Sequence, residues 1–71
     1  MSSNLIEAKA ALTGCENKAQ VMYVVECACE NDRYNYRFGS TVSDNAIYAD
    51  MDGHHELAGV LRFAERQLGR M

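Results

Sequence analysis

Apolar residues near the start of the chain recur at helical spacing. The residues that share one face of a helix here are Leu5, Ala8 and Leu12, joined by Ile6 and Ala11. Asn4 with Glu7 three residues later has the capping-box pattern, and Gly14 is a usual helix stop. The pattern therefore predicts a helix over 4–13, followed by a polar connection over 15–20.

From Gln20 to Phe38 apolar and polar residues alternate with a period of two, which is typical of half-buried strands. A two-residue loop at Asn31-Asp32 sets two glutamates opposite two arginines on the outer face, Glu30 with Arg33 and Glu26 with Arg37. The same register sets three apolar pairs on the inner face, Cys29 with Tyr34, Cys27 with Tyr36 and Val25 with Phe38. Because both faces agree, the pattern predicts a β-hairpin.

A second hairpin is predicted with its loop at Asp44-Asn45, which pairs Val42 with Ile47. A closing helix is predicted after Asp52, which is a natural N-cap. The apolar stripe of that helix consists of Leu57, Val60, Leu61, Ala64 and Leu68, widened by Phe63. We therefore expect a single α+β domain over 1–71, a two-layer sandwich in α-β-β-β-α order, with both helices on one face of a three-stranded antiparallel meander.

Composition narrows the kinds of function. The 71 residues carry a formal net charge of −3, and the basic residues are scattered apart from an arginine row near the end. A nucleic-acid-binding domain needs a basic surface, so nucleic acid is not the expected partner. The chain shows no signal-peptide pattern and no apolar run of membrane-spanning length, and its three cysteines are an odd number. We therefore expect a cytoplasmic protein with free thiols and no membrane contact.

Two clusters of residues could carry chemistry. Cys27 and Cys29 share one face of the predicted strand, roughly 6.5–7 Å apart at the backbone, which is too far for a relaxed disulfide. Buried packing explains them better than a metal site, which needs about four ligands. The second cluster holds potential metal ligands or an acid–base pair in a short run, namely Asp50, Asp52, His54, His55 and Glu56. A solvated helix start explains this cluster better, and no cofactor is expected.

The outer face of the predicted sheet is the expected interaction surface. Its contact residues are Met22, Val24, Arg37, Tyr48 and Asp50, an apolar centre within a charged rim. The sequence therefore favours a small non-enzymatic interaction module that docks on another protein, or on a second copy of itself, through this face or the acidic corner. The alternative is a small metal-binding or catalytic domain centred on Asp50, Asp52, His54 and His55.

Two protein families share features with the chain. The expected order of elements resembles the double-stranded RNA-binding domain, although "DGHHEL" stands where that family has a lysine cluster. In size, acidity and the pattern "YNYRFGSTVSDNAIYADMDGHHELAGVLRFAERQL" within residues 33–68, the chain is also similar to small acidic phage-encoded inhibitors of CRISPR surveillance complexes. That resemblance implies an accessory or inhibitory protein of a phage or mobile element, and it assigns no site residues.

Overall fold

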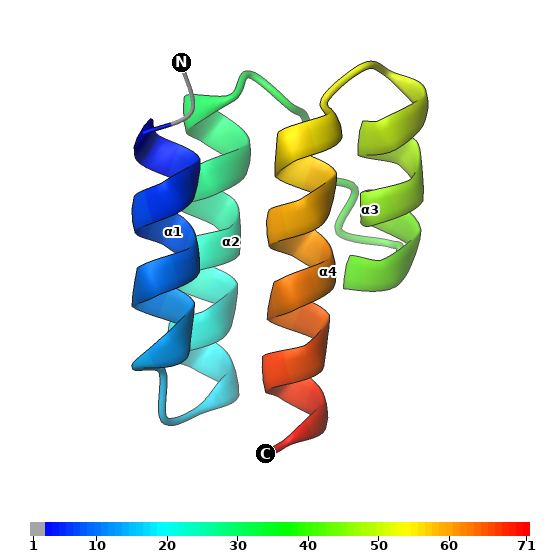
Figure 1. Cartoon of the computed structure of the whole chain (residues 1–71). Helices are drawn as coiled ribbons and strands as arrows, with labels where there is room; N and C mark the ends of the chain where they lie inside the picture. Colours follow the sequence, from blue (N-terminus) through cyan, green and yellow to red (C-terminus); the bar gives the residue numbers. More distant parts are fainter. Residues whose placement is uncertain (1–2) are drawn as a thin grey trace.

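The structure, a computed structural model, describes residues 3–71. Across these residues the chain forms four helices and no strand: α1 (Ser3–Thr13), α2 (Lys18–Asn31), α3 (Val42–Met51) and α4 (His55–Gly69). The predicted α+β sandwich and its antiparallel sheet are therefore wrong, and the fold is all-α (Figure 1). The helices predicted near both ends of the chain are present as α1 and α4. The predicted cap at Asn4 depends on a side chain that lies outside the described part.

The other helices are arranged around α4. It packs against α1, α2 and α3, whereas within residues 3–71 α3 packs against α4 and against no other helix. Figure 1 shows α4 between α3 and the α1–α2 pair, with α1 and α4 running in one direction and α2 and α3 in the other. The predicted stripe of α4 is largely confirmed, because Leu57, Val60, Leu61 and Ala64 are fully buried. An apolar stripe of this width can pack against helices on more than one side of α4.

α2 occupies the segment in which a strand was predicted. Asn17 caps it by accepting a hydrogen bond from the Gln20 backbone N–H at 2.9 Å. Its buried residues are Val21, Val25, Ala28 and Cys29. Positions 21, 25 and 29 fit a period of two as well as a helical period, which is why alternation was a misleading signal. The hairpin at Asn31-Asp32 is wrong because this segment is the end of a helix, with Asn31 the last residue of α2 and Asp32 its C-cap.

α3 replaces the second predicted hairpin. Thr41 caps it by accepting a hydrogen bond from the Asp44 backbone N–H at 3.0 Å, and Asp44 suits the positive end of the helix dipole. Ala46 and Ala49 are almost completely buried, and such small side chains allow α3 to approach α4 closely. Asp44-Asn45 is therefore the first turn of a helix and not a loop.

α2 and α3 end in the same way, with the Schellman arrangement in which a residue of positive φ follows the helix. After α2 that residue is Arg33 (φ 58°), and the Tyr34 N–H donates to the Cys29 carbonyl at 2.8 Å. After α3 it is Gly53 (φ 90°), and the His54 N–H donates to the Ala49 carbonyl at 2.8 Å. Asp52 is thus the C-cap of α3, and the prediction that it caps the final helix is wrong.

The two helix ends meet. The rings of Tyr34 and His54 lie edge to face, with centroids 5.8 Å apart and an interplanar angle of 72°. Nδ1 of His54 lies 2.9 Å from Oδ2 of Asp32, the C-cap residue of α2. The turn between α3 and α4 is therefore held against the end of α2 by an aromatic contact and a side-chain hydrogen bond.

The connection between α2 and α3 is fixed by one buried amide, that of Asn45. Its oxygen accepts hydrogen bonds from the Tyr34 hydroxyl at 2.9 Å and from the Arg37 N–H at 2.8 Å. Its nitrogen donates to the carbonyls of Arg37 and Thr41 at 3.1 and 2.8 Å. Since Asn45 is fully buried, all four bonds replace water that the amide has lost.

We predict that Asn45→Ala lowers the free energy of unfolding by about 2–4 kcal/mol, because it leaves several buried polar groups without partners. Asn45→Asp keeps the acceptor side but sets a buried carboxylate against the carbonyl oxygens of Arg37 and Thr41, so its loss is at least as large. Asn35→Ala, on an exposed residue of the same connection, is the matched control and changes stability by less than about 0.5 kcal/mol. Urea unfolding followed by circular dichroism measures all three, and equal stability of the two alanine variants would contradict the assignment.

We also predict opposite effects of glycine at the two helix ends. Arg33→Gly raises the free energy of unfolding by about 0.5–1 kcal/mol, because glycine adopts positive φ without steric cost. Gly53→Ala lowers it by about 1–2 kcal/mol through backbone strain alone, since an added Cβ meets no atom within 4 Å. The same unfolding experiment measures both changes. If the two substitutions changed the free energy of unfolding in the same direction, Arg33 and Gly53 would not share the positive-φ conformation.

Candidate functional site

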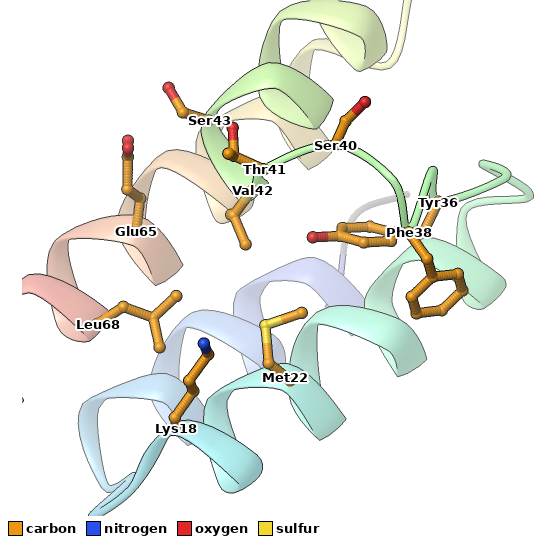
Figure 2. A pocket seen from close by; sticks show the side chains of 10 residues that line it. All are labelled: Lys18, Met22, Tyr36, Phe38, Ser40, Thr41, Val42, Ser43, Glu65 and Leu68. Atoms are coloured by element: carbon orange, nitrogen blue, oxygen red, sulfur yellow. The ribbon is translucent and has the colours of Figure 1, made fainter.

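An open groove lies between α2 and the start of α3, bounded by the end of α4 and by the connection 32–41 (Figure 2). Its volume is about 360 Å³. Its floor is apolar and comes from three helices, with Met22 of α2, Val42 of α3 and Leu68 of α4. Its rim is polar and consists of Lys18, Ser40, Thr41, Ser43 and Glu65. The groove is open because α3 packs on α4 and not on α2.

Two aromatic residues of the connection border this groove. The rings of Tyr36 and Phe38 lie edge to face with centroids 5.0 Å apart. Tyr36 is half-buried, and burial raises the pKa of its hydroxyl above the ordinary value, whereas Phe38 is 72% exposed. Because Asn45 binds both the N–H and the carbonyl of Arg37, the backbone between the two rings is fixed. Phe38 is thus displayed to solvent by a well-bonded segment, and its predicted inward pairing with Val25 is wrong.

The five predicted interaction residues do not form one surface, and only Arg37 of the connection and Tyr48 of α3 are in contact with each other. Met22 lies on the floor of the groove, whereas Val24 is half-buried against the core. The Arg37 guanidinium stacks over the Tyr48 ring at 4.2 Å from its centroid. Asp50 lies two residues further along α3, which directs it to another side of that helix. The sheet face expected to join these residues, and to form a homodimer, does not exist among residues 3–71.

The histidines and carboxylates of the predicted second cluster interact in separate pairs. His54 contacts Asp32, as described, and Nδ1 of His55 contacts Oδ1 of Asp50. Asp50 also lies 3.5 Å from the Arg62 guanidinium. The hydrogen bond from His55, helped by Arg62, holds the pKa of Asp50 below its ordinary value. Asp52 is exposed at the end of α3. Within residues 3–71 no three histidine, cysteine, aspartate or glutamate side chains gather in a geometry that could hold a metal ion.

The cysteines of "CAC" lie on different sides of α2. Residues two apart on a helix diverge by about 200°, so only one of the pair can face the core. Cys29 is 2% exposed, while Cys27 is half-buried. Burial raises the pKa of the Cys29 thiol to about 12, so this thiol stays protonated at neutral pH. The expected inward packing is confirmed for Cys29 and wrong for Cys27.

The sequence-based prediction missed the groove because it did not place a helix at α3. Thr41 followed by Asp44 has the T-x-x-D spacing of a helix start, and Asn17 followed by Gln20 has a related spacing. These two signals would have separated α2 from α3 and made residues 32–41 a connection. Such a connection would contain three aromatic residues, Tyr34, Tyr36 and Phe38, each of which must be either buried or exposed.

No protein-family model, curated protein or solved structure matches this chain. The topological resemblance to the double-stranded RNA-binding domain is overturned, because that family needs a sheet. The similarity to CRISPR inhibitors stays a prediction from the sequence. None of the helices in residues 3–71 has the length and apolar character required to cross a lipid bilayer.

We predict that the thiols react at very different rates in the folded protein. In single-cysteine variants at pH 8, alkylation of Cys29 is slower than that of Cys27 by on the order of 100-fold or more, because the attacking species is the thiolate. Urea removes the difference, since the unfolded chain exposes both thiols. The rates are measured by intact-mass spectrometry, and fast labelling of Cys29 without urea would contradict its burial.

Proposed function

We propose that the protein is a non-enzymatic module that binds a polypeptide segment in the groove between α2, the connection 32–41 and α4. The observation that carries this proposal is the exposed Phe38 at the edge of the groove. Asn45 holds the backbone of the preceding residue, Arg37, and the Phe38 ring packs edge to face with Tyr36. An aromatic anchor that is rigid before binding loses little conformational entropy when a partner covers it.

The lining of the groove supports the same function. Protein-binding surfaces combine an apolar centre with a polar rim, and the groove has this arrangement. Met22 on the floor is unbranched and adaptable, so it can fit side chains of different shape. Lys18 and Glu65 are both exposed at the rim, where charges affect orientation and rate of association more than affinity.

The distribution of reactive groups favours binding over catalysis. The described residues that line the groove include no histidine and no cysteine. His54 and His55 are each engaged by a carboxylate at the opposite end of α3 from Val42, and the Cys29 thiol is buried and protonated. A general base and a nucleophile within reach of one substrate are therefore not brought together in this groove.

Photo-crosslinking in the source cells tests this function. Benzoylphenylalanine in place of Phe38 is expected to form a specific crosslink to a polypeptide, which mass spectrometry identifies. The matched control carries the same label at Ile6, an apolar residue of α1 that is 66% exposed and outside the groove. The added change Met22→Asp is expected to reduce the crosslink at position 38 by about tenfold, because it puts a charge on the apolar floor. Identical products from positions 38 and 6 would rule out the groove as the binding site.

A further inference from the structure

One side of α2, which includes Met22 of the groove, is self-complementary in charge. Lys18, Met22 and Glu26 are spaced by four residues, so they follow one another along the same side of the helix. Lys18 and Glu26 are exposed, and the half-buried Met22 lies midway between them. The ion pairs within residues 3–71 involve neither Lys18 nor Glu26. On this side of the helix a cation lies one turn before an apolar centre and an anion lies one turn after it. When two copies of the helix pack antiparallel, the cation of each therefore faces the anion of the other.

Phe38 lies at one end of the groove, on one side of Met22 (Figure 2). Besides the groove, Phe38 lines a smaller hollow of about 160 Å³ on the side of Glu26 and Glu30. The other end of the groove, on the far side of Met22, is lined by Lys18 and Leu68 (Figure 2). A two-fold axis near Met22 therefore brings the protruding ring of each copy to the groove of the other. The ring and the recess that accepts it are thus found on one surface.

We propose that the polypeptide bound in the groove is a second copy of this chain, in a two-fold dimer with the α2 helices antiparallel across Met22. This inference rests on the proposed function of the groove. Phe38 of each copy enters the groove of the other between Met22 and Leu68, and Lys18 of each copy faces Glu26 of the other. The buried rings supply most of the affinity, and the exposed charges fix the register.

This surface differs from the sheet face that the sequence indicated. Val24 and Tyr48, both named for the sheet, are not needed, whereas Phe38 was expected to point inward and is now central. Each copy carries a net charge of −3, so a dimer requires local attraction that offsets the general repulsion between copies. The two Lys18–Glu26 contacts provide attraction of this kind at the edges of an apolar centre.

Charge reversal tests the proposal with sedimentation equilibrium over a concentration series from low micromolar to submillimolar. The unmodified chain is expected to dimerise. Lys18→Glu and Glu26→Lys each place like charges in both contacts and raise the dissociation constant by on the order of tenfold. The double variant Lys18→Glu/Glu26→Lys restores opposite charges and returns the dissociation constant close to the original. Mixing the two single variants is expected to give a heterodimer that is tighter than either homodimer.

Matched controls separate local contacts from total charge. Lys9→Glu and Glu7→Lys on α1 change the net charge as the α2 variants do, and are expected to leave the dissociation constant within about twofold. Phe38→Ala is expected to raise it by on the order of 30-fold or more, because the dimer loses the ring twice. Circular dichroism checks that each variant is folded. We expect that all of them are, because every substituted residue is exposed.

The proposed dimer would be overturned if the chain stays monomeric over the whole concentration series. It would also be overturned if Phe38→Ala leaves the dissociation constant unchanged. A double variant that is as weak as the single variants would overturn it as well. These outcomes are distinct from failure of the proposed function. A monomer whose label at position 38 crosslinks to another protein keeps the groove as a binding site, whereas a monomer with no groove-specific crosslink contradicts both.

Discussion

The amide of Asn45 is the contact on which the arrangement of the second half of the molecule depends. It joins the first turn of α3 to the backbone of the preceding connection, and it does so with both its donor and its acceptor side. An amide in this position has no favourable alternative, because any movement of the connection leaves polar groups buried without partners. The network therefore selects one path for residues 34–41. That path turns Tyr34 inward, keeps Tyr36 at the surface of the core and leaves Phe38 in solvent.

The same path explains why the groove exists. In an up-and-down bundle with short loops α3 would run antiparallel to α2 and pack beside it. Here the connection first returns along the molecule, so α3 runs parallel to α2 and is separated from it. The contact between the ends of α2 and α3, through Tyr34, His54 and Asp32, closes only one end of that separation. The other end stays open, and the residues that line it come from segments far apart in the sequence.

The sequence predicted the terminal helices well and the middle of the chain poorly, for physical reasons that can be named. In α4 the apolar residues at 57, 60, 61 and 64 fit a helical period and no other. In α2 the spacing of four between Val21, Val25 and Cys29 fits both periods, which the burial of Ala28 and the exposure of Tyr23 distinguish. Charges added to the error, because Glu26 and Glu30 stand at a spacing that a hairpin would pair with Arg37 and Arg33. The groove could not be predicted from α2 alone, since its floor depends on where the Asn45 network places α3. Met22, predicted for the outer sheet face, instead lines this groove between helices.

The central position of α4 also determines when this chain can fold during its synthesis. α1 and α2 can meet as a helical hairpin as soon as both have left the ribosome, because they pack against each other. α3, by contrast, has no partner among the earlier helices, and its apolar side stays exposed until α4 has been made. Short isolated helices are marginal in water, so α3 gains stable structure only when α4 emerges. A chain from which α3 has emerged but α4 has not is therefore only half-folded, and the apolar side of α3 is then exposed to chaperones.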